Sequence, residues 1–227
     1  MAATDAVMFY NNRTGNTIPG AFPEKWWEGA ALFDTLIQYW YFTKDSSHNA
    51  LVSEGLNWQS GSGHDFLPAN FTSYLGNTDQ LAWGHASMTA AEVRFPQKSS
   101  NPAWAKIAEN VFNSVAARWD NTSCGGGLRW QRFPYQEGYD MKTASANGAF
   151  FQLAARLAHH TKNETYARWA DKAWNWSASS PLLTTSNWTV ADSTSCKNDC
   201  SDRSNIQWSL NYAAYLSGAA YMHNVVS

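Results

Sequence analysis

A short polar motif, Gly76-Asn77-Thr78-Asp79-Gln80, stands directly before an apolar helical pattern and contains the carboxylate best placed for chemistry. Glycine and asparagine commonly open helices, so Asp79 is expected in the first helical turn. There the helix dipole and the free backbone N–H groups favour a negative charge. The motif alone allows two interpretations: a reactive carboxylate, or a simple N-terminal cap.

Histidines give no competing centre. His64, His85, His159, His160 and His223 form no constellation with a serine or cysteine nucleophile. A Ser-His-Asp hydrolase is therefore not supported.

The three cysteines, Cys124, Cys196 and Cys200, all lie in loop-like sequence. In an oxidising compartment one pair could be bridged, leaving one thiol over. Cys196 and Cys200 lack a matching pair of cysteines or histidines elsewhere, so we expect no metal site and no cofactor.

Aromatic residues are unusually frequent, with 13 Trp, 10 Tyr and 11 Phe. Indole and phenol rings combine a flat apolar face with a polar edge. That face matches the C–H face of a pyranose, so a Trp-rich cleft suits sugars. Most of these rings are nevertheless expected to fill the core.

Composition narrows the class of protein further. The 227 residues are 44% hydrophobic and 15% charged, which is typical of a globular chain. The net charge of −2 and the lack of a basic run make nucleic acid an unlikely partner. No apolar stretch is long enough to span a membrane, and the first residues lack the features of a signal peptide. Secretion is still expected, because six N-glycosylation sequons occur, at Asn12, Asn70, Asn121, Asn163, Asn175 and Asn187.

Helical periodicity dominates the chain, and no convincing β-hairpin pattern is present. Asn77 and Asn163 are expected N-terminal caps, and Pro102 is expected at a first helical position. The segments 121–142 and 180–203 are predicted to be long loops. Helices are predicted near 3–10, 24–43, 46–60, 78–95, 102–119, 145–161, 163–178 and 204–223.

The predicted helices alternate in character. Those at 24–43, 78–95, 145–161 and 204–223 mix Gly and Ala with large aromatics, which is typical of elements buried on most sides. Those at 102–119 and 163–178 are amphipathic. This alternation indicates an all-α fold, an α/α toroid with inner and outer rings. A closed toroid needs about twelve helices and about eight are counted, so the single domain, 1–227, is expected to be incomplete.

The chain resembles glycoside hydrolase family 76, the α-1,6-mannanases, especially fungal cell-wall members that act on GPI-anchor glycans. The resemblance covers nearly the whole chain in order. It lies in WWEGAALFDTLIQYWYFTKD, DFLPAN, LGNTDQLAWG, RWDNTSCGGGLRWQ, YDMKTASANGAFFQLAARLA and NIQWSLNYAAYLSGAAYM. It implies an (α/α)6 toroid whose C-terminal third is missing here.

The resemblance also implies a retaining mechanism with two adjacent aspartates, a nucleophile and then a general acid/base. The acid/base position is Asp79, whereas the nucleophile position holds Thr78. A threonine hydroxyl is a poor nucleophile without an activating base. Either another carboxylate substitutes (Asp65, Glu28, Asp140 or Glu137), or the chain binds glycan without cleaving it, or it is a divergent or engineered variant of an active parent.

Further positions matching the family are expected to line the cleft at helix starts and in the glycine-rich loop. For each, ordinary packing or a solvated loop is the alternative. They are Trp27, Glu28, Asp65, Asn77, Gln80, Arg129, Trp130, Asp140, Lys142, Asn147, Trp208 and Asn211.

The sequence therefore predicts a secreted or cell-surface protein acting on α-mannan or a GPI-anchor glycan in fungal wall biogenesis, anchored to wall or membrane in its full-length form. The acceptor, water or wall glucan, stays open. The alternatives are a non-catalytic glycan-binding pseudoenzyme and a helical scaffold for protein partners. The scaffold leaves the polar motif and the tryptophans unexplained.

Overall fold

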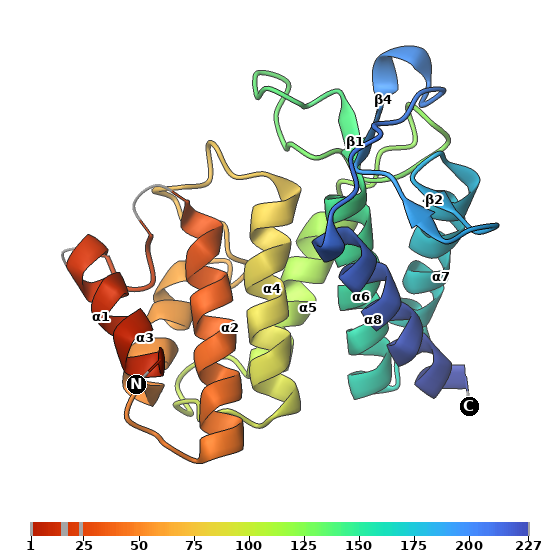
Figure 1. The fold of residues 1–227 in the computed structure, drawn as a ribbon. Helices are drawn as coiled ribbons and strands as arrows, with labels where there is room; N and C mark the ends of the chain where they lie inside the picture. Colours follow the sequence, from red (N-terminus) through yellow and green to blue (C-terminus); the bar gives the residue numbers. More distant parts are fainter. Residues whose placement is uncertain (1, 15–17, 23–24, 227) are drawn as a thin grey trace. The chain divides into compact units, whose positions relative to one another are not determined.

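The computed structural model describes residues 2–14, 18–22 and 25–226 (Figure 1). These residues form two compact units. The first unit comprises 1–73 and 82–111, and the second comprises 74–81 and 112–227. Two helices contribute residues to both units. The units are therefore described one at a time.

Helices form at each of the eight predicted places. Each predicted range overlaps one observed helix, although the ends differ by several residues. The helices are α1 (Ala2–Thr14), α2 (Trp26–Thr43), α3 (Asn49–Gln59), α4 (Asn77–Glu92), α5 (Trp104–Ala116), α6 (Ala144–Thr161), α7 (Glu164–Ser179) and α8 (Ser209–Val226).

The first unit is built around Trp83 of α4, which is fully buried. Its indole ring lies 5.1 Å from that of Trp26 and 5.8 Å from the ring of Phe33, both on α2. Phe66 stacks on it from the loop after α3, at 5.2 Å. Gly29 lets α2 approach, because a Cβ there would meet the Trp83 ring at 2.9 Å. Aromatic packing thus accounts for these rings, as the core interpretation predicted.

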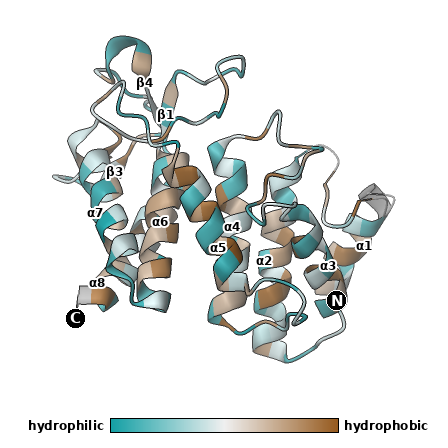
Figure 2. Cartoon of the chain, turned by 180° about the vertical axis from the view of Figure 1, so that it is seen from behind, coloured by the Kyte–Doolittle hydropathy of each residue, from teal (hydrophilic) through white to brown (hydrophobic). Residues whose placement is uncertain are grey.

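The second unit is built around α6, which lies beside α7 and α8 (Figure 1). Phe150 of α6 stacks on Phe112 at 5.2 Å, and Tyr166 of α7 meets Phe112 edge-on at 4.9 Å. The Tyr215 hydroxyl of α8 donates to Ser177 Oγ at 2.8 Å. Helix α7 buries one face only and shows mainly hydrophilic residues in Figure 2, which confirms its amphipathic prediction.

Two strand pairs correct the expectation that no β-structure would form. β1 (Met141–Thr143) pairs antiparallel with β4 (Ser193–Ser195), and β2 (Leu183–Thr184) forms a hairpin with β3 (Thr189–Val190). A short 3-10 helix, η1 (Cys196–Asn198), follows β4. The strands are two or three residues long, too short to show an alternating pattern. The β1–β4 pair joins the two predicted long loops to each other, whereas β2 and β3 both lie within the second loop.

Three details of the helix predictions were wrong. Pro102 precedes α5 by two residues instead of occupying its first position. Helix α8 begins at Ser209, five residues later than predicted, and is not buried on most sides: Leu210 and Leu216 are 68% and 74% exposed.

Asn163 does cap α7, since its side chain accepts from Thr165 N. Across the described residues, no helix combines the length and apolarity that a bilayer crossing requires.

The glycine-rich loop between α5 and β1 is held by close packing. Gly127 has φ +93°, and a Cβ there would lie 2.4 Å from the Trp176 ring of α7. Gly125 has φ +63°, but a Cβ would meet nothing within 4 Å. Gly127 therefore combines a positive φ with a steric requirement, whereas Gly125 has the positive φ alone.

Replacing Gly127 by alanine should lower the free energy of unfolding by about 3 kcal/mol, because strain and overpacking add. The matched control, Gly125→Ala, should cost about 1 kcal/mol, from the left-handed backbone alone. Urea unfolding of both variants measures the difference. Equal losses would show that the indole does not constrain the loop.

Candidate functional site

The Asp79 carboxylate lies in the first turn of α4, in the second unit. Its Oδ2 accepts a 2.7 Å hydrogen bond from Gly76 N, just before the helix. This is the reciprocal half of a capping box, so the predicted capping role is real. The Asp79 carboxyl has a second property besides capping the helix. Burial raises the pKa of Asp79 above its usual value, and the Gly76 N–H only partly opposes this.

Tyr74 connects Asp79 to an open pocket. Burial and the negative charge of Asp79 both raise the pKa of the Tyr74 phenol. Gln131 approaches the same place from the other side: a Cβ on Gly76 would meet Gln131 Oε1 at 2.7 Å and Asp79 Oδ2 at 3.4 Å. A carboxyl whose neutral form is favoured thus lies among hydrogen-bonding groups.

Asn77 ties the start of α4 to the glycine-rich loop. Its backbone N–H donates to Trp130 O at 3.0 Å, and its side-chain Nδ2 donates to Arg129 O at 2.8 Å. Its Oδ1 accepts from Arg118 Nε at 2.7 Å. The predicted cap role of Asn77 is therefore replaced by a link to the loop. Gln80 is buried in the same network, where its Oε1 accepts from Arg118.

Trp130 is held by its backbone while its indole ring stays 37% exposed. Its N–H donates to Met141 O at 2.8 Å, on β1. The ring rests against Gly138, where a Cβ would lie 2.5 Å from the indole. Any side chain at position 138 would push the ring away, so Gly138 permits this orientation.

An open pocket of about 1030 Å³ lies at Trp130. Aromatic, amide and charged side chains line it, which is the mixture that a sugar requires. Tyr135 is 70% exposed and Tyr74 55% exposed. The lining residues are Tyr74, Trp130, Gln131, Tyr135, Gln136, Glu137, Gly138, Asp140, Met141, Ser195 and Lys197.

Two of the carboxylates considered as substitute nucleophiles line this pocket. Asp140 Oδ2 pairs with Lys197 Nζ at 2.7 Å, and the hydrogen bond and charge of Lys197 lower the pKa of the Asp140 carboxyl. Glu137 is exposed. Both carboxylates therefore line the same open pocket.

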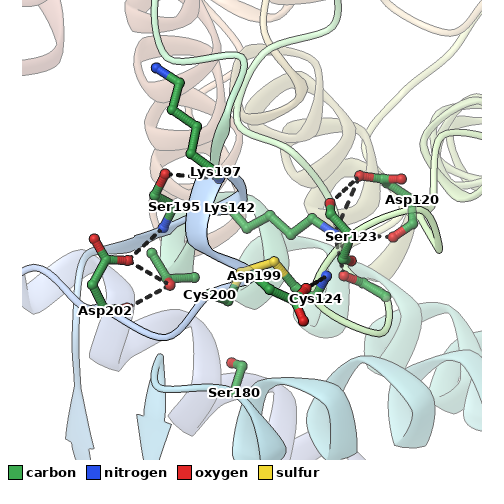
Figure 3. Close-up of a disulfide and its surroundings, with 12 residues drawn as sticks. Asp120, Ser123, Cys124, Lys142, Ser180, Ser195, Lys197, Asp199, Cys200 and Asp202 are labelled. Carbon is green, nitrogen blue, oxygen red and sulfur yellow. Dashed lines mark hydrogen bonds and ion pairs between the residues drawn. A yellow bond between two sulfur atoms is a disulfide. The ribbon is translucent and has the colours of Figure 1, made fainter.

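A buried charge cluster supports the loop that carries Trp130 (Figure 3). Asp120 Oδ2 pairs with Arg129 at 2.9 Å and with Lys142 at 3.4 Å. Lys142 Nζ also donates to the carbonyls of Asp120, Ser123 and Gly126. Burial alone would raise the pKa of Asp120, but hydrogen bonds from Thr122 and Ser123 and the charge of Lys142 hold it well below its usual range.

The disulfide Cys124–Cys200 lies beside this cluster, with Cys196 as the free thiol among the described residues. One bridge and one remaining thiol were predicted, and the structure confirms that arrangement. The three sulfurs lie within 4.8 Å of one another. Two of them are bonded together and so cannot act as thiolate ligands.

Burial corrects several predicted sugar contacts. Lys142 and Asn147 are fully buried, and Asn147 uses its side-chain amide on Leu128 and Thr143. Asn77, Gln80 and Asn211 are also at most 1% exposed. These five side chains are buried parts of the scaffold, although Asn77 also lines a smaller pocket of about 350 Å³. Trp130 and Asp140 line the open pocket and Trp208 is 56% exposed, so their contact with a sugar stays a prediction.

Arg129 is neither fully buried nor part of the open pocket at Trp130. Its side chain is 17% exposed and is committed to Asp120 and to Tyr139 O, which accepts at 3.1 Å. It lines a smaller pocket of about 350 Å³ that Gln131 also lines. Whether Arg129 contacts a sugar stays a prediction.

Trp27, Glu28 and Asp65 belong to the first unit. Trp27 is 43% exposed, and Glu28 lies 3.9 Å from Lys25 in a surface ion pair. Asp65 lies in the loop after α3, where its N–H donates to Ser60 O. Their expected role at the cleft stays a prediction.

Gln131, Tyr135 and Lys197 were missed as candidate residues. The sequence offered one signal for Gln131, its position directly after Trp130. Lys197 reaches the pocket only because β4 pairs with β1, which its local sequence does not reveal. Tyr135 lies in a loop without a regular pattern.

Thr78 precedes Asp79 in the same helical turn. Its Oγ1 is buried and makes no hydrogen bond to the described residues. A neutral hydroxyl supplies neither the negative charge nor the basicity of a carboxylate. The site as it stands contains an acid, an aromatic wall and two surface carboxylates.

The chain matches the model of glycosyl hydrolase family 76 over residues 1–226. Saccharomyces cerevisiae mannan endo-1,6-alpha-mannosidase DCW1 is 39% identical over 95% of this chain and 49% of its own length. The protein of the same name from Candida albicans is 41% identical over 90% of this chain and 46% of its own length. The chain thus spans about half the length of these curated relatives.

Solved structures give the same fold. Dfg5 from Chaetomium thermophilum, in complex with glucosamine, has a TM-score of 0.93 and 40% identity over 98% of this chain and 57% of its own. An inactive variant of an α-1,6-mannanase from Salegentibacter sp., in complex with α-1,6-mannotriose, has a TM-score of 0.75 at 18% identity, over 98% and 63% of the two chains. The eight helices are part of an (α/α)6 toroid fold, and the chain belongs to glycosyl hydrolase family 76.

Proposed function

We propose that this chain contributes the glycan cleft of a glycoside hydrolase acting on α-1,6-linked mannan. The observation that carries the proposal is Asp79, a carboxyl whose pKa is raised by burial and which adjoins the Trp130 pocket through Tyr74 and Gln131. A perturbed carboxyl beside an open aromatic pocket is a general signature of a catalytic site.

In this proposal Asp79 is the general acid. A glycosidic oxygen leaves as an alcohol only when it is protonated, so the acid must keep its proton near neutral pH. Burial favours that neutral form. The exposed faces of Trp130 and Tyr135 stack against pyranose rings, and Gln131 offers an amide to hydroxyl groups.

The substrate class rests on the relatives. Curated proteins with 39% and 41% identity are named as mannan endo-1,6-alpha-mannosidases, and the bacterial structure holds α-1,6-mannotriose. On that basis we propose α-1,6-mannan as the substrate class of this chain. From the family resemblance alone, we propose a GPI-anchor glycan as the cellular target and water or wall glucan as the acceptor. A retaining mechanism, expected from the family resemblance, needs a second carboxyl about 5–5.5 Å from the acid.

Thr78 supports a second candidate, glycan binding without turnover. The hydroxyl stands where the family resemblance places the nucleophile, and its Oγ1 makes no hydrogen bond to the described residues. A chain that keeps the pocket and the acid but lacks the nucleophile would bind mannan and release it unchanged.

Thr78→Asp separates these candidates. If only the nucleophile is missing, the variant should cleave an α-1,6-linked manno-oligosaccharide at least about 100-fold faster than the wild type, with similar affinity. Calorimetric titration and product chromatography on the same samples provide both numbers, with Thr78→Asn as the uncharged control. Equal cleavage by wild type and Thr78→Asp would mean that another carboxylate, such as Asp140 or Glu137, already serves. Absent binding in all three would refute the proposed cleft.

Asp79→Asn tests the raised pKa through stability. A carboxyl whose folded-state pKa exceeds its unfolded value weakens the fold once it ionises, so the wild type loses stability as pH rises through that window. The asparagine variant should therefore melt at a higher temperature than the wild type at pH 7. The gap should close below pH 3.8, where both forms are neutral. A wild type that melts higher than Asp79→Asn at pH 7 would contradict the proposed acid.

We also propose that the protein is secreted or displayed at the cell surface. The disulfide fits an oxidising compartment. Asn70, Asn121, Asn163, Asn175 and Asn187 are all exposed, as glycosylation requires. The side chain of Asn12, the sixth sequon, lies outside the described residues.

Protein produced in a fungal secretory host should lose mass on treatment with an enzyme that removes N-linked glycans. Glutamine at the five exposed sites should abolish the loss, apart from any contribution of Asn12. A wild-type mass that equals the polypeptide mass before treatment would contradict glycosylation.

A further inference from the structure

Three sulfur atoms that are far apart in the sequence gather at one end of the second unit. Cys124 and Cys200 are bonded to each other, and Cys196 Sγ lies within 4.8 Å of both. Figure 3 shows the disulfide between the loop at Ser123 and the segment 195–202. A thiol at this distance from a disulfide is close enough to react with it after a small side-chain movement.

Backbone hydrogen bonds hold the three cysteines in this arrangement. Cys196 N donates to Asp140 O at 2.7 Å, and Cys200 N donates to Ser195 O at 2.9 Å. Cys124 N donates to Asp199 Oδ1 at 2.7 Å. These bonds fix the backbone positions of the three cysteines, so the thiol stays near the disulfide.

Both half-cystines have a left-handed backbone. Cys124 has φ 56° and Cys200 has φ 58°, a region that non-glycine residues rarely occupy. The native bridge is thus held in a conformation that costs backbone energy.

A buried ammonium group lies nearby. Lys142 is fully buried, and burial lowers the pKa of its ammonium, while the negative charge of Asp120 opposes that effect. A cysteine reacts as its thiolate, and reactive cysteines commonly lie near cationic groups.

We propose that Cys196 is an exchange thiol whose thiolate attacks Cys124 Sγ, forming a Cys124–Cys196 disulfide and releasing Cys200. The Cys196 thiol gives its proton to water. The new S–S bond forms as the Cys124–Cys200 bond breaks, and the departing Cys200 thiolate takes up a proton. One disulfide and one thiol are present before and after, so no oxidant or reductant is consumed.

Loop length favours attack on Cys124 over attack on Cys200. The native bridge closes a separation of 76 residues, and a Cys124–Cys196 bridge shortens it by only four, so the constraint on the unfolded chain is nearly unchanged. A Cys196–Cys200 bridge would close a turn and release that constraint. Cys200 is 7% exposed and packs as a small apolar side chain when free.

Exchange would act on the pocket at Trp130, which gives it a regulatory meaning. Ser195 and Lys197, the two neighbours of Cys196, both line that pocket, and Lys197 pairs there with Asp140. Pulling Cys196 toward Cys124 moves this wall. The chemistry itself stands independently of the proposed function, because it needs only the three sulfurs.

Tryptic mapping without reduction tests the exchange on the full chain. Lys197 lies between Cys196 and Cys200, so trypsin separates all three cysteines into the peptides 119–129, 173–197 and 198–203. The protein is held at pH 8, quenched with acid, alkylated with N-ethylmaleimide and digested. We expect linked 119–129/173–197 peptides, alkylated Cys200, and more of both at pH 8 than at pH 6.

Two variants sharpen the result. Cys196→Ser should lose all alkylation at Cys200. Cys200→Ser, which has two thiols and no disulfide, should form the Cys124–Cys196 bridge quantitatively when oxidised glutathione is supplied as the oxidant. Label on Cys196 alone in the wild type, together with two free thiols in Cys200→Ser, would overturn the proposal. So would a yield of the new bridge that rises with protein concentration, because that indicates exchange between molecules.

Discussion

The candidate site depends on one backbone junction, where the first residue of α4 meets the loop before β1. Asn77 N–H donates to Trp130 O, and Asn77 Nδ2 donates to Arg129 O. These bonds join residues more than 50 positions apart, and they place Asp79 and Trp130 in the same small region. Because Asn77 is buried, water cannot substitute for a lost bond there without cost. The aromatic wall and the carboxyl are thus positioned by the same polar contact.

The supporting layer makes that junction rigid. Asp120 pairs with both Arg129 and Lys142 under the loop, and the carbonyls around Lys142 Nζ complete its hydrogen bonding. A buried ion cluster of this kind contributes geometry more than net stability, because desolvation offsets much of the attraction. The cluster also shows that a charged residue near the pocket can have a structural role, because Asp120 and Lys142 hold the loop that carries Trp130.

The sequence was sufficient for the helices and insufficient for the loops. Periodic apolar residues and caps such as Asn163 predicted eight helices, since these signals are local. The pairing of β1 with β4 involves residues 50 positions apart in strands of three residues, so no local pattern revealed it. Lys142 was expected at the cleft because it matches a family position just before a predicted helix, but its ammonium is buried and donates to three carbonyls. The position of Asp79 in the first turn of α4 was predicted correctly because its motif is short and contiguous, and its catalytic role stays a prediction.

The central claim is that the pocket at Trp130 binds an α-1,6-linked manno-oligosaccharide. Titrating ¹⁵N-labelled protein with α-1,6-mannotriose and following the tryptophan indole N–H signals by NMR tests it most directly. Trp130→Phe assigns the signal, and Trp58, equally exposed at 37% but in the first unit, serves as the internal reference. The account predicts a saturable shift of the Trp130 signal with Trp58 unchanged. An unmoved Trp130 signal at saturating trisaccharide would contradict it.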